Sequence, residues 1–337
     1  MSTQPAATVQ DEQPPVLIEN VSKSYGAAVV LNEVNLTVAA GESLVLVGHN
    51  GAGKTTLMKL LLGLVPPTAG QVRVFGNDPT AASAVAQRRA LGYLPESIVF
   101  DEAMTGHELL KFYAGLKGVD GASCDVLLER VGIADAAHRR LSTWSKGMRQ
   151  RLGLAQAMLG RPRLMLLDEP TSGLDPSLRS TFYEIIETLR ADGVTVLISS
   201  HALGEVEDHA DRIAIMRQGN VLACGTLAEL TAQAALPVRL RISCAAGAAG
   251  VIVTKLQAAG TNVQAESAAG RNINVSQVDT QHVEVICPHT EKMAVLQQIA
   301  GLGAAIADVD IRPPRLDEIY AHVMAAGIPA MAKDAHQ

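Results

Sequence analysis

The sequence predicts an α/β protein with two domains, and three observations lead to that prediction. From residue 16 onward, short strand-forming runs bounded by Gly and Asn alternate with helical patterns, as in residues 42–47 followed by 55–62. The 337 residues are 48% apolar and 18% charged, which suits one sizeable globular domain and a smaller one. After residue 230, an Ala-rich connection and Pro237 indicate a domain boundary near Ala234.

The first predicted domain, residues 16–233, has a largely parallel core sheet. Its later strand candidates are residues 71–75, 91–94, 163–167, 194–199, 212–216 and 221–224, with helix candidates between most of them. Between residues 105 and 159 the apolar residues fall at helical spacing instead. We therefore expect a helical subdomain, at about residues 97–160, inserted into the α/β core.

The second predicted domain, residues 234–325, is a small α+β unit. The expected order is strand 238–242, helix 249–258, strand 272–276, strand 282–287, helix 290–299 and strand 305–311. This βαββαβ order is typical of a ferredoxin-like fold. Residues 1–15 are polar and rich in Pro and Gln, without a secretory signal pattern, and predict a disordered tail; residues 326–337 predict a flexible one.

Composition excludes several classes of function. A formal net charge of −6 and the lack of a Lys/Arg run argue against a nucleic acid partner. The four cysteines are far apart and form no CxxC pair, which fits a reducing cytoplasm better than a disulfide framework or a zinc site. No apolar run approaches the roughly 18 residues that span a bilayer, so a membrane role must come through a partner.

A glycine-rich loop follows the strand at residues 44–47 and opens a helix, which is the context that a phosphate-binding P-loop requires. The loop consists of Gly48, His49, Asn50, Gly51, Ala52, Gly53, Lys54 and Thr55. Glycines let backbone N–H groups surround phosphate oxygens, and the helix N-terminus adds positive potential. We expect Lys54 to contact the β and γ phosphates of ATP and the Thr55 hydroxyl to bind Mg²⁺.

An apolar run at residues 164–167 ends in two carboxylates, Asp168 and Glu169. A buried parallel strand delivers such residues at its carboxyl end, where ligands of parallel sheets bind. This Walker B arrangement predicts that Asp168 holds Mg²⁺ through water. Glu169 is expected to orient and deprotonate the attacking water, a role worth about 10²- to 10⁴-fold in rate. The alternative for this segment is an ordinary turn at a strand end.

With these motifs, the sequence resembles the ATPases of ABC transporters over residues 17–230. The remaining motifs of that family occur in its order: Ser145-Lys146-Gly147-Met148-Arg149-Gln150, Asp168-Glu169-Pro170-Thr171-Ser172-Gly173-Leu174-Asp175, and Ser200-His201. The resemblance implies that Ser145 and Gly147 close on the γ-phosphate held by the Lys54 of another subunit, so that the active unit is a homodimer. It also implies an antiparallel β subdomain beside the core sheet.

The same resemblance assigns roles to single residues. His201 matches the residue that contacts the γ-phosphate and acts with Glu169 and Lys54 in catalysis, and Asp175 matches a loop between the two sites. Thr56 completes the ATP-binding loop. Tyr25 falls where the family stacks an aromatic ring on adenine, although a tyrosine in this position could equally be part of the core.

The sequence departs from the family pattern in two places, at Glu96 and in the signature, where Trp144-Ser145-Lys146-Gly147-Met148 stands for the usual Leu-Ser-Gly-Gly-Gln. Glu96 stands where the family usually has a glutamine near Mg²⁺ and the attacking water, and it adds a negative charge near the γ-phosphate. Lys146 replaces a glycine, and its charge could favour phosphate or point into solvent. Met148 replaces a glutamine and cannot donate its hydrogen bonds. We expect these changes to modify ATP binding and hydrolysis without abolishing them.

Within the family, four short sequence segments, here called phrases, resemble those of NosF-type ATPases. NosF-type ATPases work with a NosY-type membrane subunit and a periplasmic NosD-type protein in maturing the copper site of nitrous-oxide reductase. The phrases lie at residues 93–97, 145–156, 236–239 and 314–320. This resemblance implies a position on the cytoplasmic face of the bacterial inner membrane. An ATPase of an ABC-2-type drug or polysaccharide exporter is the alternative, because the C-terminal phrase is widespread there. A non-catalytic nucleotide sensor is a remote one.

Overall fold

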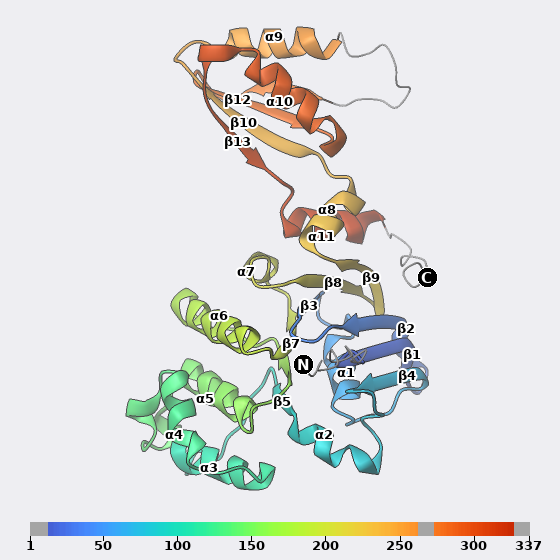
Figure 1. Cartoon of the computed structure of the whole chain (residues 1–337), viewed down its shortest axis with the longest axis vertical. Coiled ribbons are helices and arrows are strands. Elements are labelled where there is room, and N and C mark those ends of the chain that lie inside the picture. Colours follow the sequence, from blue (N-terminus) through green and yellow to red (C-terminus); the bar gives the residue numbers. More distant parts are fainter. Residues whose placement is uncertain (1–12, 262–272, 327–337) are drawn as a thin grey trace, which may run out of the picture. The chain divides into compact units, whose positions relative to one another are not determined.

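A computed structural model describes residues 13–261 and 273–326, and Figure 1 shows its backbone. The described residues separate into two compact units, 13–226 and 227–326. The terminal segments predicted as tails, 1–15 and 326–337, lie almost entirely outside the described residues. Within the described ranges, no helix is long and apolar enough to cross a membrane.

A six-stranded sheet forms the centre of the first unit, with the strand order β5-β6-β7-β3-β8-β9. Neighbouring strands are parallel except β8 and β9, which confirms the predicted largely parallel sheet. The strands are β3 (Ser43–Val47), β5 (Leu91–Leu94), β6 (Leu164–Asp168), β7 (Thr195–Ser200), β8 (Arg212–Arg217) and β9 (Asn220–Gly225). Strands β3, β6 and β7 are buried at every position, because both faces of the sheet are covered; they therefore read as continuous apolar runs.

The order of the three central strands gathers the predicted motifs at one edge of the sheet. Strands β6, β7 and β3 are parallel neighbours, so their carboxyl ends lie together. Asp168 at the end of β6 lies opposite Ser199, and Val47 at the end of β3 lies opposite Ser200. The P-loop, the Walker B carboxylates and the segment after β7 that contains His201 therefore lie side by side.

An antiparallel sheet with the order β2-β1-β4 lies beside this centre, as the family resemblance implied. Its strands are β1 (Val16–Tyr25), β2 (Ala28–Val38) and β4 (Ala69–Val74). One hydrophobic core joins this sheet, helix α1 (Lys54–Leu61) and the central sheet, as the buried side chains of Ile18, Leu57 and Leu166 illustrate. The P-loop is thus anchored to packed elements at both of its ends.

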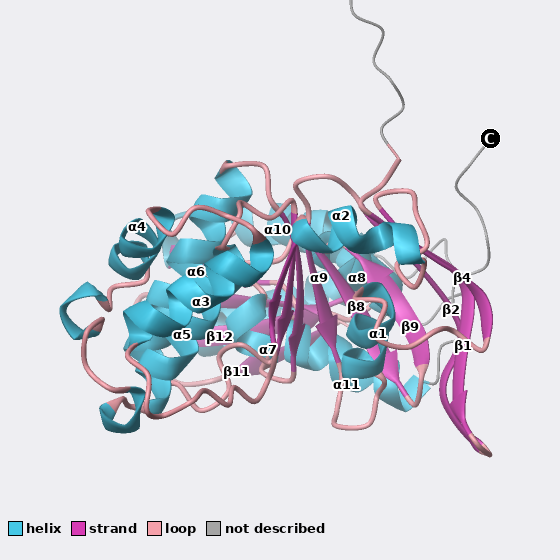
Figure 2. Cartoon of the chain, turned by 90° about the horizontal axis from the view of Figure 1, so that it is seen from below, coloured by secondary structure: helices cyan, strands magenta, loops and turns pink. Residues whose placement is uncertain are grey.

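Helices fill the segment between β5 and β6 (Figures 1 and 2), at the place of the predicted helical subdomain. Thr105 caps the first of them through a capping box with Glu108. The helices of this unit after α1 are α2 (Val85–Arg89), α3 (Gly106–Lys117), α4 (Ser123–Arg130), α5 (Lys146–Met158), α6 (Pro176–Ala191) and α7 (Leu203–Val206). Helices α3, α4 and α5 pack on one another, and α5 also packs on β5. Short 3₁₀ turns occur at Ala82–Ala84, Ala134–Ala136 and Leu141–Thr143.

The second unit contains a four-stranded antiparallel sheet with the order β11-β12-β10-β13. Its elements are α8 (Leu227–Ala234), β10 (Val238–Cys244), α9 (Ala249–Thr261), β11 (Asn274–Gln277), β12 (His282–Cys287), α10 (Lys292–Ala300), β13 (Ile306–Arg312) and α11 (Leu316–Ala326), with 3₁₀ turns at His289–Glu291 and Gly303–Ala305. When β10, β11, β12 and β13 are numbered 1 to 4 in chain order, their order across the sheet is 2-3-1-4. This order and the βαββαβ succession confirm the predicted ferredoxin-like fold. Apolar residues of α9 and α10 cover one face of the sheet.

The division into compact units falls before the predicted boundary near Ala234. The residues of helix α8 before Ala234 lay within the predicted first domain, but the helix groups with the second unit and packs on α11. Its buried residues, Leu230 and Ala234, provide the apolar side of this helix. A contact between two helices so distant in sequence leaves no local signal, which explains the difference.

Replacing Leu240 by Ala tests the core of the second unit. Leu240 is fully buried in β10, so its truncation is expected to destabilise this unit by about 2–5 kcal/mol. Circular dichroism during denaturant unfolding measures the change, while fluorescence of Trp144, the single tryptophan, follows the first unit. Val251→Ala on α9, at a side chain that is 57% exposed, is the matched control. Equal effects of the two substitutions would contradict the assigned core.

Candidate functional site

The P-loop surrounds a cavity of about 240 Å³ at the carboxyl end of β3. The cavity is lined by Val30, His49, Asn50, Gly51, Ala52, Gly53, Lys54, Thr55, Thr56, Glu96 and Glu169. Gly53 has a φ of 105°, and a Cβ at this position would lie 2.6 Å from Leu31 Cδ2, so only glycine fits there. A Cβ at Gly48 would lie 2.6 Å from the carbonyl oxygen of Met216. The loop backbone is therefore pressed against its surroundings and open toward the cavity.

Lys54 opens helix α1 and is buried, with an exposed fraction of 6%. Its ammonium donates a hydrogen bond to the carbonyl of Gly48 and lies 3.1 Å from Oε1 of Glu169. A buried cation requires such partners, because its charge has lost the solvation of water. The lysine head is thus held at the cavity wall between the loop and the Walker B carboxylate.

Glu169 is the first residue after β6 and adopts a left-handed backbone conformation, with a φ of 46°. Its N–H donates to the Ser199 carbonyl at 3.2 Å and to Ser199 Oγ at 2.9 Å, which holds this unusual conformation in place. The Ser199 hydroxyl donates in turn to Asp168 Oδ1 at 2.5 Å. Ser199 therefore holds the side chain of Asp168 and the backbone of Glu169 from the neighbouring strand.

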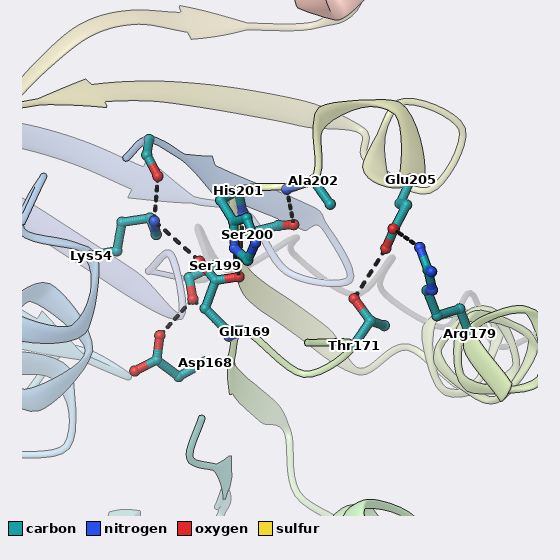
Figure 3. Close-up of polar contacts among 11 residues, drawn as sticks. Lys54, Asp168, Glu169, Thr171, Arg179, Ser199, Ser200, His201, Ala202 and Glu205 are labelled. Carbon is teal, nitrogen blue, oxygen red and sulfur yellow. Dashed lines mark hydrogen bonds and ion pairs between the residues drawn. The ribbon is translucent and has the colours of Figure 1, made fainter. Parts of the chain in front are cut away.

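His201 also contacts Glu169, as Figure 3 shows. Its Nδ1 lies 2.6 Å from Oε2 of Glu169, and its backbone N–H donates to the same oxygen at 3.3 Å. The contact suits the ring tautomer with the proton on Nδ1, because a carboxylate oxygen accepts hydrogen bonds. The two oxygens of Glu169 thus join the Lys54 ammonium to the His201 ring. The imidazole is 57% exposed, which leaves it accessible to a ligand.

Burial and hydrogen bonding shift two pKa values around the site. Burial raises the pKa of Tyr93 to about 12, and the negative charges of Asp168 and Glu96 add to the effect, so this phenol stays neutral. The backbone N–H of Leu178 and then the hydroxyl of Ser177 hold the pKa of Asp175 below its usual value. Asp175 therefore stays ionised as the N-cap of α6.

The signature residues lie at the N-terminus of α5 and do not line the cavity of their own chain. Ser145 caps the helix by accepting from the N–H of Met148 at 3.3 Å. Lys146 is exposed, and its Nζ occupies the place where a side chain on Gly173 would begin. Gly147 is buried, and a Cβ there would lie 2.5 Å from Leu178 Cδ1. These residues pack on the loop that leads to Asp175.

Tyr25 and Glu96, two predicted ATP contacts, are both exposed. Tyr25 is the last residue of β1, and its ring is 48% exposed with the Lys23 ammonium 4.9 Å from the ring centroid. It is therefore not a core residue. Glu96 is exposed yet lines the cavity together with Thr55 and Glu169. Glu96 therefore lies at the cavity, at the position where the family usually has a glutamine.

Comparison with known proteins identifies the chain. Residues 31–172 match the family model described as ABC transporter. The chain is 33% identical over 319 residues to the daunorubicin resistance ATP-binding protein DrrA3 of Streptomyces coeruleorubidus, covering 91% of this chain and 95% of that protein. The chain belongs to the ABC transporter family. It is the ATP-hydrolysing subunit.

Two further similarities extend along different parts of this ATPase. The linearmycin resistance ATP-binding protein LnrL of Bacillus subtilis is 28% identical over 312 residues, covering 90% of this chain and 96% of that protein. A solved structure of an ATP-binding subunit of an ABC transporter matches with a TM-score of 0.60 and 32% identity. It covers 65% of this chain and 92% of the solved chain.

The residues in and next to the cavity fit a nucleoside triphosphate and Mg²⁺. The glycine cradle and the buried Lys54 ammonium suit phosphate oxygens, and Thr55 and Glu96 supply oxygen donors of the kind that Mg²⁺ prefers. Asp168 does not line the cavity; it is buried at the end of β6, next to Glu169. No cluster of three or more His, Cys, Asp or Glu side chains within the described residues could hold a metal ion. When bound, Mg²⁺ neutralises charge on the phosphate oxygens.

Several residues with a positioning role were not predicted. Ser199 supports both Walker B residues, and Gln150 is buried with its Nε2 donating to the Pro170 carbonyl at 2.8 Å. Gln150 belongs to the signature phrase but carried no predicted role. The available sequence signal for Ser199 was a polar pair, Ser199 and Ser200, directly after an apolar strand. Val30 lines the cavity from β2 and had no signal of its own.

Replacing Lys54 by Ala is expected to lower ATP hydrolysis strongly. The substitution removes the cation that faces the phosphate site, and loss of one such charge-stabilising group typically costs about 10²- to 10³-fold in rate. Phosphate release from purified protein with saturating ATP and Mg²⁺ measures the loss. Lys59→Ala is the control, because this exposed lysine lies on the same helix. Unchanged release in the Lys54 variant would exclude its assigned role.

Proposed function

We propose that two copies of this ATPase form an ATP-closed dimer that drives a membrane partner. The observation that carries the proposal is the division of the motifs within one chain. Lys54, Glu169 and His201 contact one another, whereas Ser145, Lys146, Gly147 and Met148 do not line the cavity of their own chain. In the proposed dimer, the N-terminus of α5 from one copy closes on the nucleotide of the other.

The residues act in separate steps in this proposal. The P-loop N–H groups, Lys54 and Thr56 bind and orient the triphosphate, Tyr25 stacks on adenine, and Glu169 accepts a proton from the attacking water. His201, already held by Glu169, contacts the γ-phosphate. The Lys54, Glu169 and His201 contacts argue against a non-catalytic nucleotide sensor, because they assemble the residues that hydrolysis requires.

An apolar groove supports the docking of a membrane subunit. Its volume is about 370 Å³, and it is lined by the segment that follows α1 and by residues of α2, β5, α3 and α5. Leu64 and Leu116 line it with exposed fractions of 65% and 68%, and Phe112 on α3 is 54% exposed. Leu109 of the same helix is buried and belongs to the core of the helical segment. We infer that a cytoplasmic helix of a permease docks on this surface and that the ATPase is peripheral at the cytoplasmic face of the bacterial inner membrane.

The NosF type is our first candidate for the complex. It rests on the phrases at residues 93–97, 145–156, 236–239 and 314–320, which lie in both units of the chain. In this role the permease is of the NosY type and acts with a periplasmic NosD-type protein in assembling the copper site of nitrous-oxide reductase. The ATPase supplies hydrolysis and does not bind the cargo itself.

A drug or polysaccharide exporter of the ABC-2 type is the second candidate. Two relatives that match over at least 90% of this chain are named as resistance proteins, one for daunorubicin and one for linearmycin. Their matches extend into the second unit, so the C-terminal phrases do not separate the candidates. The cargo is set by membrane and periplasmic partners, and an ATPase site is shared by many transporters.

Glu169→Gln tests the proposed dimer. Glutamine cannot take the proton from water, so hydrolysis is expected to fall about 10²- to 10⁴-fold while ATP still binds. The variant should accumulate as a dimer with ATP, measured by size-exclusion chromatography with light scattering. Glu184→Gln, at an exposed glutamate of α6, is expected to behave as the wild type. A Glu169 variant that binds ATP and stays monomeric would contradict the dimer.

Chromosomal Lys54→Ala distinguishes the two candidate complexes. For the NosF type, nitrous-oxide reductase purified from the variant cells should lack the absorption spectrum of its copper site, and the cells should release nitrous oxide. Resistance to anthracyclines and other drugs should stay unchanged. An exporter predicts the reverse: an intact reductase with increased drug sensitivity or altered surface polysaccharide. Lys59→Ala serves again as the control in both measurements.

A further inference from the structure

The loop after Glu169 is held by a polar network that the catalytic contacts do not include. Residues 170–175 lead from the catalytic carboxylate to Asp175, the N-cap of α6. Figure 3 shows that Thr171, Arg179 and Glu205 converge beside this loop from three different segments. Thr171 belongs to the loop, Arg179 to the first turns of α6, and Glu205 to α7.

Glu205 connects the two ends of the loop. Its Oε2 accepts a hydrogen bond from the Thr171 hydroxyl at 3.2 Å, near the start of the loop. Its Oε1 forms an ion pair with Nη1 of Arg179. The Nε of the same arginine donates to the carbonyl of Leu174 at 3.0 Å, next to Asp175. One carboxylate and one guanidinium therefore fix both ends of the loop.

The network also reaches the histidine of the site. Glu205 lies on α7, which begins two residues after His201, and its N–H donates to the Ala202 carbonyl at 3.1 Å. The Ala202 N–H donates to Ser200 Oγ at 3.0 Å. His201 is thereby tied to the loop from one side through Glu169 and from the other through α7 and Glu205. A shift of the loop must move the histidine segment as well.

Burial suits these contacts for positioning. Thr171 is 7% exposed, and the side chains of Arg179 and Glu205 are 32% and 26% exposed. The planar arginine fork donates to Glu205 and Leu174 together, which a lysine cannot do with the same geometry. Gln150 of α5 also donates a hydrogen bond to the Pro170 carbonyl. The loop is therefore held at Pro170 as well as at Thr171 and Leu174.

We propose that Arg179 and Glu205 are positioning residues for ATP hydrolysis, which set the loop at residues 170–175 and, through it, the relative placement of Glu169, His201 and Asp175. They touch neither the phosphate cavity nor the catalytic side chains. Their effect is on the rate of the chemical step, because a misplaced catalytic group costs rate even when the nucleotide is still bound. This inference rests on the ATPase activity of the chain and does not require the proposed dimer partner or cargo.

Steady-state ATPase measurements on Arg179→Ala, Glu205→Gln and the double variant test the proposal. Each single change should lower kcat about 10- to 100-fold, with KM for ATP within about 3-fold of the wild type. The double variant should lose no more than the larger single effect, because both changes break one network. Arg179→Lys should recover part of kcat by keeping the ion pair while losing the Leu174 contact.

Arg190→Ala is the matched control on the same helix. Arg190 also forms ion pairs, 3.0 Å from Glu187 and 2.5 Å from Asp211, but it does not touch the loop. The Arg190→Ala substitution is expected to lower the midpoint temperature of unfolding about as much as Arg179→Ala does, while kcat stays unchanged. Additive losses in the double variant, a change in KM alone, or an equal loss of kcat in Arg190→Ala would overturn the proposal. An inactive wild type would instead contradict the ATPase assignment itself.

Discussion

The carboxylate of Glu169 is the contact on which the rest of the site depends. One of its oxygens lies beside the Lys54 ammonium and the other beside His201 Nδ1, so three distant segments meet at one side chain. Both charged partners Lys54 and Glu169 are buried, and an unpaired charge in such surroundings would be strongly unfavourable. The pairing therefore holds the P-loop against the Walker B strand and keeps Lys54, Glu169 and His201 together.

This contact is possible because β3, β6 and β7 are adjacent and parallel. Their buried, apolar sequences place them in the middle of the sheet, where both faces are covered. The site then forms at their carboxyl ends, as expected for an open α/β sheet. Ser199 refines the arrangement, since its hydroxyl and carbonyl hold the left-handed backbone of Glu169 and the side chain of Asp168.

The loop at residues 170–175 connects the chemistry of one chain to its predicted dimer interface. It starts at Glu169, receives Gln150 from the signature helix, and ends at the cap of α6. Arg179 and Glu205 hold its two ends, and Lys146 lies across Gly173 in its middle. A lysine in place of the usual glycine therefore contacts the loop of its own chain. The second unit has a hydrophobic core of its own.

The sequence by itself determined the chemistry of this ATPase: the P-loop, the Walker B carboxylates and the βαββαβ order of the C-terminal unit are local patterns that require only neighbouring residues. Tertiary structure decided the strand order of the central sheet, the membership of α8 in the second unit, and the direction of Lys146. It also decided the roles of Ser199, Arg179 and Glu205, which no motif marked. Ser199 contacts Glu169, Glu205 contacts Thr171 and Arg179 contacts Glu205 over about 25 to 35 positions along the chain, and such contacts arise only when strands and helices pack.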